Sequence, residues 1–543
     1  MNKIKGYFSE EINRYRFISL VIFVLIITAL AWQSDDAYHA YIMARNLVEG
    51  NGFVYNIGER ATASSCPLFT LVIAGGYFLL RNMFISSLII CIAFSTAAYA
   101  IITKHFCKNK NQIILSFIIL VGSVSFISYT TAGLENCMLF FLAALFMVTY
   151  FENETFDFKR LLIIALLISL IAMTRMDAVL IFAPMAVYVY LVKREGVSFI
   201  KAVGTGILGL LPFILWELFA TFYFGFPFPN TAYAKLGTNF PLKEYIIRGL
   251  QYYFNALLCD PIILLVPVCS FAAVLIVKKA KYFWPMAGVV LYGVYLLYIG
   301  GDFMMGRHFT VMFFVSLTVY LVMRNREAVL NHPGICFEKV FTVLVSAALL
   351  FTYTMTPVTS QFQFGAKFTS PISDERAGYF KYTSLIDNAI SMITVGDMCI
   401  RQAWNEQGMM ELESGDYPGG VLDNAPGISV YYYPELYLVD KYALADPFLT
   451  KLPAVMEDNW RIGHMYRDIP EGYSDSLLQD QNLIKDENLS EYLDIIRLIT
   501  RGDLFDKNRI QAIIDINLGK YDYLLDNYKA GLDEHNRQVV KEQ

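Results

Sequence analysis

The order of hydrophobic and polar positions divides the chain into two parts. Apolar runs of about 17–25 residues, the length of a membrane-crossing helix, recur as far as Pro357 and are absent after it. We therefore predict a polytopic α-helical membrane part, residues 1–357, with about eleven transmembrane helices. The predicted spans are Phe17–Ala31, Phe84–Thr103, Gln112–Thr131, Cys137–Phe151, Leu161–Thr174, Ala178–Val192, Val203–Phe224, Pro261–Val277, Phe283–Ile299, Phe309–Met323 and Val340–Thr356.

The apolar stretch Pro67–Leu80 is too short to span comfortably, and we predict a juxtamembrane helix on the outer side. With this choice, every basic cluster between the predicted spans falls on the same side of the membrane. Cytoplasmic loops carry an excess of Lys and Arg, so this side is predicted to be the cytoplasm. The amino terminus is then cytoplasmic and the polar tail extracytoplasmic. The clusters are Lys3, Lys5, Arg14 and Arg16; Lys104, Lys108 and Lys110; Lys159 and Arg160; Lys193 and Arg194; Lys278, Lys279 and Lys281; and Arg324 and Arg326.

Residues 358–543 have the pattern of a soluble domain. β-branched and aromatic content predicts strands at Ile390–Ile400 and Leu436–Val439. Helices are predicted at Glu375–Ala389, Glu491–Thr500 and Asp506–Ile516. We therefore expect a small extracytoplasmic α/β domain after the membrane part.

Composition and charge agree with this division. The 543 residues are 56% hydrophobic and only 17% charged, which argues against a soluble protein. The tail from Val358 to Gln543 has 17 Lys and Arg against 30 Asp and Glu, a net charge of −13. Because the tail is acidic and the basic residues lie at helix ends, we expect no nucleic-acid partner.

An acidic pair, Asp35 and Asp36, directly follows the first predicted span. Such a pair is costly in lipid, so we expect it at the water interface or in a cavity. Ser34 or Asp35 is a plausible N-cap for a helix that runs to Val48 and ends at Gly50-Asn51-Gly52. The pair could therefore serve chemistry or simply cap this helix.

Other polar segments also fall on the predicted outer side, and we expect these loops to converge on one face of the bundle. They are Gly133-Leu134-Glu135, Arg175-Met176-Asp177, Pro227–Gly237 and Gly300–His308. A lipid-linked substrate could enter a site there sideways from the bilayer.

These segments together resemble the GT-C superfamily of polyprenyl-phosphate-sugar-dependent glycosyltransferases, and most closely the bacterial family that adds terminal β-(1→2)-arabinofuranose. The resemblance is scattered over about residues 34–480. It is carried by Asp35-Asp36-Ala37-Tyr38, Ala44–Gly52, Ser65-Cys66-Pro67-Leu68, Gly133-Leu134-Glu135, Thr174-Arg175-Met176-Asp177, Pro229-Asn230-Thr231, Ala234-Lys235, Gly300-Gly301-Asp302-Phe303, Arg307, Leu444-Ala445-Asp446-Pro447, Leu452-Pro453, Trp460–His464, Arg467, Pro470 and Gly472-Tyr473. Cys66 and Met176 depart from the family pattern and leave the substrate open.

The resemblance implies an inverting glycosyltransferase of the bacterial inner membrane. An acceptor hydroxyl on a cell-envelope glycan or glycolipid would attack the anomeric carbon of a sugar held on a polyprenyl phosphate. Asp36, with Asp35 as the alternative, is then the expected general base.

The leaving lipid phosphate needs cations to stabilise its charge, and Lys235, Arg307 and His308 are the candidates. The ordinary interpretation is that these side chains only extend from helix ends to the membrane surface. Arg45 is a further candidate, although it lies about two and a half helical turns beyond Asp36, on the opposite face of an unbroken helix.

The remaining expected substrate residues are Glu135, Arg175, Asp177, Asn230, Asp302 and His464. Each also has an ordinary interpretation. Arg175 could form a structural ion pair with Asp177 or Glu135, Asp302 could cap a loop, and the segment around His464 could dock the tail on the membrane part.

Other motifs and function classes are less well supported. The six histidines have no metal-ligand spacing, and no nucleotide-binding glycine motif occurs, so we expect no cofactor, with a carboxylate-bound divalent ion left open. A transporter or flippase for lipid-linked glycans is the main alternative, but it should place polar residues at the bilayer midplane, where Glu217 is the main exception. A non-catalytic assembly protein would leave the outer Asp, Lys and Arg residues without a role.

Overall fold

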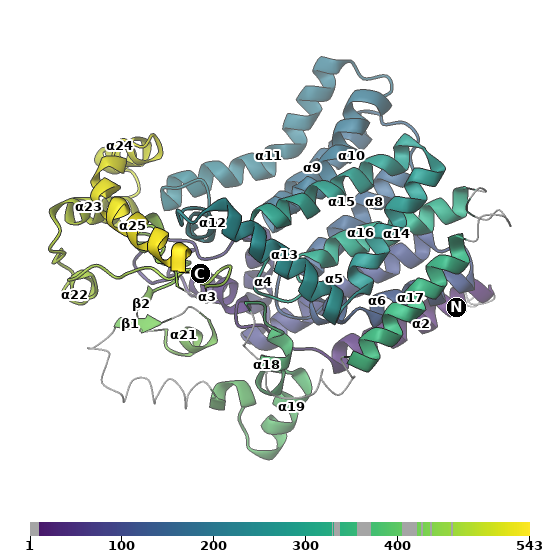
Figure 1. Cartoon of the computed structure of the whole chain (residues 1–543), viewed down its shortest axis with the longest axis horizontal. Helices are drawn as coiled ribbons and strands as arrows, with labels where there is room; N and C mark the ends of the chain where they lie inside the picture. Colours follow the sequence, from purple (N-terminus) through teal and green to yellow (C-terminus); the bar gives the residue numbers. More distant parts are fainter. Residues whose placement is uncertain are drawn as a thin grey trace. The chain divides into compact units, whose positions relative to one another are not determined.

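A computed structural model describes residues 10–327, 330, 337–355, 371–403, 421–424, 427–434, 437–457 and 460–542 of the chain (Figure 1). Packing divides the chain into two units. Unit 1 comprises Met1–Ser34, Ser87–Phe213 and Ile246–Asp387; unit 2 comprises Asp35–Ser86, Ile214–Tyr245 and Asn388–Gln543. Two segments from the apolar part of the sequence thus pack with the tail in unit 2. The predicted boundary at residue 357 does not separate these two units.

Each predicted span coincides with a helix, except that Gln112–Thr131 contains two helices, α6 and α7. Thr356, the end of the last predicted span, lies outside the described residues. The interruptions have local causes: Ser123 ends α6, and its hydroxyl then accepts the N–H of Phe126 to start α7. Helix α10 continues into a π-helical turn, Val189–Lys193. The helices are α2 (Glu11–Ala29), α5 (Met83–Phe106), α6 (Lys110–Gly122), α7 (Val124–Ser128), α8 (Asn136–Phe151), α9 (Phe158–Thr174), α10 (Val179–Tyr188), α11 (Phe199–Phe224), α14 (Ile262–Val277), α15 (Ala280–Tyr298), α16 (Phe309–Arg326) and α17 (Phe337–Met355).

Several of these helices mark a membrane-embedded protein. Among the described residues, four segments are long and apolar enough to cross a bilayer: α2, α5, Met176–Lys193 and α11. Helix α13 (Leu242–Cys259), which was not predicted, forms a fifth candidate together with α14, bent by 99° between them. The count of eleven spans remains a prediction, because the other apolar helices are shorter or less apolar than a full crossing requires.

Helix α16 forms the centre of unit 1. Its residues from Phe309 to Met323 are all buried, and it packs against α8, α14 and α15 (Figure 1). Phe126 from α7 and Phe140 from α8 stack on Phe314 of α16, with ring centroids 6.0 and 5.7 Å apart. This packing positions the loop that precedes α16, which carries candidate residues.

Unit 2 combines the tail with earlier segments: α3 (Ala37–Val48), α4 (Pro67–Leu80) and α12 (Asn230–Leu236). Helix α4 confirms the predicted 14-residue helix, which begins with Pro67 and ends at Arg81 in the left-handed conformation. The hydrophobic core of unit 2 contains Phe226 and Ala234, which pack with the apolar face of α23. That face includes Leu489, Leu493 and Ile496.

The described part of the tail is mainly helical. The predicted helices at Glu491–Thr500 and Asp506–Ile516 are confirmed as α23 and α24, and Asp506 caps α24. The predicted strand Leu436–Val439 is confirmed from Tyr437 onward as β2, which pairs in parallel with β1; Leu436 lies outside the described residues. The tail elements are α18 (Glu375–Thr383), α19 (Leu385–Thr394), β1 (Val421–Asn424), α21 (Ile428–Tyr432), β2 (Tyr437–Asp440), α22 (Tyr473–Leu478), α23 (Glu487–Arg501), α24 (Lys507–Asn517) and α25 (Asp526–Glu542).

Two predictions about the tail are wrong. Ile390–Ile400 is not a strand: α19 occupies it to Thr394, because Ile386, Ile390 and Ile393 recur at helical rather than alternating spacing. Glu375–Ala389 is not one helix, because α18 ends at Ser384, whose hydroxyl accepts the N–H of Asp387 and starts α19.

Candidate functional site

Unit 1 gathers charged side chains from the ends of three helical connections. Glu135 directly precedes α8, Arg175 separates α9 from a 3₁₀ turn that contains Asp177, and His308 directly precedes α16. Asp302 and Arg307 come from the loop between α15 and α16. These three connections, which the sequence predicted to converge on one face of the bundle, do lie together in unit 1, and their placement on the outer side remains a prediction.

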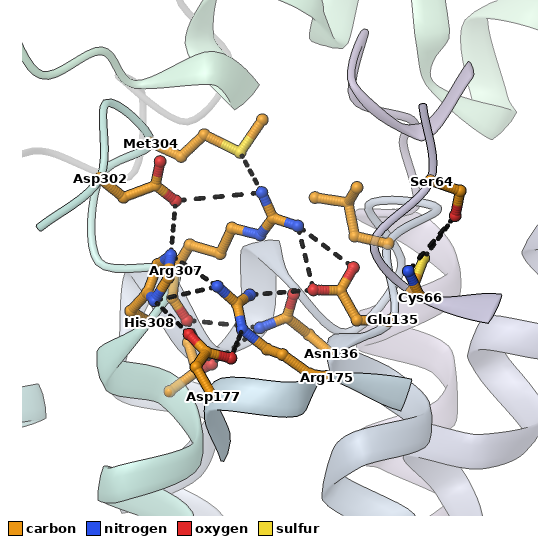
Figure 2. Close-up of polar contacts among 12 residues, drawn as sticks. Ser64, Cys66, Glu135, Asn136, Arg175, Asp177, Asp302, Met304, Arg307 and His308 are labelled. Atoms are coloured by element: carbon orange, nitrogen blue, oxygen red, sulfur yellow. Dashed lines mark hydrogen bonds and ion pairs between the residues drawn. The ribbon is translucent and has the colours of Figure 1, made fainter. Parts of the chain in front are cut away.

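Glu135 is shared by two arginines. Its Oε1 lies 2.9 Å from Nη1 of Arg175, and Nη2 of Arg307 lies 3.1 Å from both of its carboxylate oxygens (Figure 2). Only 3% of Glu135 is exposed. Burial would raise the pKa of Glu135, but Arg307 and Arg175 outweigh it and lower that pKa. Glu135 is therefore an ionised anchor for both guanidinium groups.

His308 joins the remaining carboxylates to this pair. Its Nε2 lies 3.1 Å from Oδ2 of Asp302 and accepts from Nη2 of Arg175 at 2.7 Å. Arg175 Nε in turn donates to Oδ1 of Asp177 at 2.9 Å, and the hydroxyl of Tyr292 donates to the other oxygen of Asp177 at 3.3 Å. Burial, followed by the positive charge of Arg175, lowers the pKa of His308. At neutral pH the histidine is therefore uncharged.

The cluster already pairs its own charges. Among the described residues, three carboxylates face two guanidinium groups and a neutral imidazole, so the formal charges of these six side chains sum to −1. Such a site favours sugar hydroxyls or a structural role over a phosphate, since an anion would have to displace a carboxylate from each arginine. The structural ion pair that the sequence left open for Arg175 is present, with both Glu135 and Asp177.

The loop before α16 depends on glycine. Gly301 has φ +75°, and a Cβ there would lie 2.6 Å from the side chain of Tyr252. The hydroxyl of Tyr252 accepts the backbone N–H of His308 at 3.1 Å. The close approach of loop and ring therefore sets the position of His308.

Unit 2 holds the acidic pair. Asp36 precedes α3 without a side-chain capping bond, and its Oδ1 lies 4.0 Å from Nε2 of His39. Asp35 Oδ1 accepts the backbone N–H of Ile428, the first residue of α21, at 2.7 Å. Gly427 lies so close that a Cβ there would collide with the Asp35 carboxylate. Among the described residues, the tail thus covers Asp35 with backbone and not with a charged partner.

This environment changes the acidity of Asp35. Burial is the main cause that raises its pKa to about 7, and the charge of Asp36 adds to it. The hydrogen bond from Ile428 acts in the opposite direction. A carboxylate that titrates near neutral pH matches what a general base needs.

Arg45 lies further along the same helix and also contacts α21. Its Nη1 donates to the carbonyl of Tyr431 at 2.6 Å, and its guanidinium lies 4.7 Å from the centre of that ring. The side chain is 8% exposed, its Nε has no partner, and no carboxylate among the described residues lies within ion-pair distance. A buried cation without a counter-charge is suited to an anionic ligand.

The other predicted residues of unit 2 have diverse surroundings. Asn230 begins α12 and is 2% exposed; its Nδ2 lacks a hydrogen-bond partner among the described residues. Lys235 lies in the last turn of α12 and is half-buried. The ring of His464 lies 5.0 Å from that of Tyr442, and Trp460 nearby packs 5.0 Å from Phe240.

Sequence reasoning missed several neighbours of these sites. Tyr292 sits inside the apolar helix α15 and Tyr252 on the buried face of the amphipathic α13, where an aromatic residue carries no signal of a polar partner. Ile428 and Tyr431 act through backbone atoms, which no residue type can signal. Gly427 follows a proline, and that turn signal could have drawn notice.

A scan of protein-family models and searches of curated proteins and of solved structures gave no match to the chain. Across the residues that the structure describes, no group of three or more His, Cys, Asp and Glu side chains is placed to hold a metal ion.

Proposed function

We propose that this chain is an integral-membrane glycosyltransferase. It transfers a sugar, arabinofuranose or a related one, from a polyprenyl phosphate to a glycan or glycolipid of the bacterial cell envelope. The observation that carries the proposal is in unit 2, where two groups border α21: a partly buried carboxylate with a pKa of about 7, and a buried guanidinium that has no carboxylate partner among the described residues. These two groups supply a base and an anion contact.

The two groups have distinct roles in the proposed reaction. Asp35 removes the proton of the acceptor hydroxyl, whose oxygen bonds to the anomeric carbon as the bond from that carbon to the phosphate oxygen breaks. The lipid phosphate leaves with the electron pair of that bond, and Arg45 stabilises its charge. Attack opposite the leaving group inverts the configuration. The sequence favoured Asp36 as the base. We now favour Asp35, because it is more enclosed and its pKa is raised to about 7.

Arg45 replaces Arg307 and His308 as the leading phosphate ligand in this proposal. Arg307 is already bound by Glu135, and His308 is uncharged. Lys235 and Asn230 remain candidates for the donor. Glu135, Arg175, Asp177 and Asp302 would hold the loops and offer oxygen atoms to sugar hydroxyls, and His464 remains a candidate for the acceptor.

The topology belongs to the same proposal: eleven spans, a cytoplasmic amino terminus and an extracytoplasmic α/β tail in the inner membrane. It is supported by the helices found at all predicted spans. Within unit 1, the first described tail residues support it further, because Leu385 donates its N–H to the carbonyl of Ala31, which follows α2. The part of the tail around Leu385 thus lies at the end of α2 that leads to Asp35.

Transfer by the purified protein tests the proposal, with a panel of radiolabelled polyprenyl-phosphate sugars and envelope glycan acceptors. We expect Asp35→Asn to lower transfer by about 10²–10⁴-fold. Asp475→Asn, at an exposed carboxylate of the tail, is the control and should be fully active.

Each other result has a definite meaning. Loss of transfer in Asp36→Asn alone would move the base to that residue. Full activity of both variants would refute a role for the acidic pair. Movement of intact lipid-linked sugar across liposomes without transfer would establish the transporter alternative.

A further inference from the structure

Helix α24 of the tail lies across the end of a membrane-spanning helix. Arg509 is buried and its Nη2 donates to the carbonyls of Phe222 and Tyr223, at 2.8 and 2.9 Å, in the last turn of α11. Asn517 Nδ2 donates to the carbonyl of Gly225 at 2.8 Å. The last carbonyls of a helix have no partner within it, and a cation there also complements the helix dipole. Arg509 and Asn517 therefore fasten α24 to the end of α11.

This attachment determines the depth of α24 relative to a bilayer. Helix α11 has 26 residues, is among the most apolar of the chain, and is only 17% buried over its apolar window. Most of its surface must therefore face lipid. An element that covers the final carbonyls of such a helix lies where the hydrocarbon region gives way to the headgroups.

The outward face of α24 is apolar. Ile510, Ile514 and Leu518 recur at four-residue intervals, are 36, 48 and 78% exposed, and so form one stripe on the helix. Phe505, just before the helix, is 80% exposed. Asp515, the acidic residue of the helix, is buried away from this stripe. Apolar side chains this exposed, and this close together, mark a contact surface and not a solvated one.

The stripe continues the lipid-facing surface of α11. The rings of Phe222 and Phe505 lie 5.6 Å apart, and Phe222 shares a helical face with Leu218 and Leu215, which are 63 and 55% exposed. One apolar surface thus passes from α11 through Phe505 to α24, and the exposed Lys507 lies on the same helical face. A lysine at a membrane interface can extend its ammonium group to the headgroups while its stem stays with the apolar side chains. We propose that α24 is an interfacial helix, whose face of Phe505, Ile510, Ile514 and Leu518 inserts into the leaflet of the bilayer at which α11 ends.

Spin labels on the full-length protein in lipid nanodiscs test this proposal. Nitroxides are attached at Phe505→Cys and, separately, Leu518→Cys, with Glu491→Cys on the exposed polar face of α23 as the matched control. Because all three positions are exposed, the substitutions leave the core intact. Labelling of the unsubstituted protein measures the contribution of the native cysteines.

Collision with oxygen, which concentrates in lipid, and with a water-soluble nickel chelate gives the depth of each label. We expect the labels at residues 505 and 518 to lie about 5–10 Å below the headgroup boundary, and the control label to lie in water. Labels at 505 and 518 that are as accessible to nickel as the control would overturn the proposal. Dipolar broadening between labels at 518 would also overturn it, because the face would then contact a second copy of the chain.

Discussion

The charged cluster of unit 1 and the acidic pair of unit 2 show two ways in which a protein holds buried charges. In unit 1, Arg175 and Arg307 are each bound by carboxylates, and the cluster is closed by its own ion pairs. In unit 2, Asp35 is held by a backbone N–H and Arg45 by a carbonyl and an aromatic ring.

The difference indicates where a ligand would bind. Removing one partner from a closed cluster leaves a buried charge uncompensated, so a ligand that displaces a partner has to offset that cost. Charges held only by neutral groups keep their electrostatic field available to a substrate. The acidic pair, with Arg45, is therefore the better candidate for chemistry, although the cluster contains more charged residues.

The largest expected effect comes from opening the cluster. Arg175→Ala leaves Asp177 and part of Glu135 without their cation, and we expect a loss of stability of about 3–5 kcal/mol. Thermal unfolding in detergent measures it. Lys159→Ala, an exposed cation on α9, is the control and should unfold like the parent. An unchanged midpoint for Arg175→Ala would mean that the cluster does not stabilise the fold.

A smaller effect is expected from Arg45. Arg45→Gln keeps a donor for the Tyr431 carbonyl but removes the charge, which costs about 1.5–3 kcal/mol of donor binding if a phosphate is the partner. Equilibrium binding of a polyprenyl-phosphate sugar measures it, with unfolding followed in parallel. Arg81→Gln, an exposed arginine at the end of α4, should bind normally. If Arg45→Gln binds the donor as well as the parent, the phosphate contact lies elsewhere.

The smallest effect is a shift in pH dependence. Since the pKa of Asp35 is about 7 and a base must be ionised, the transfer rate should rise with pH through about 7 and then level. Asp36 raises the pKa of Asp35, so Asp36→Asn should move the midpoint to lower pH. A rate profile measured under donor saturation tests both statements. A midpoint that stays constant in Asp36→Asn would exclude this coupling.

Helix positions were predictable because apolar runs of spanning length leave the backbone one way to satisfy its hydrogen bonds in lipid. Irregularities were not. The break at Ser123 depends on a capping bond, and the sharp bend between α13 and α14 follows Asp260, whose Oδ2 accepts from the Ser123 hydroxyl at 2.7 Å. Such a bond between distant segments leaves no local pattern. The prediction of a strand at Ile390–Ile400 was wrong because it relied on β-branched content and neglected the helical spacing of the isoleucines.

The candidate residues show the same division. Their presence at the ends of apolar helices was visible in the sequence, because charges are excluded from lipid and collect where helices end. Which of them pair was not visible, since Glu135, Arg175 and Arg307 are far apart along the chain.

The sequence by itself thus determined that the protein is helical and membrane-embedded, and which polar residues border its helices, because hydrophobic length and charge placement are local properties. Only the tertiary structure decided which charges neutralise one another and which remain available. It also decided that backbone of the tail covers Asp35, because pairing, burial and pKa depend on the atoms that packing brings together.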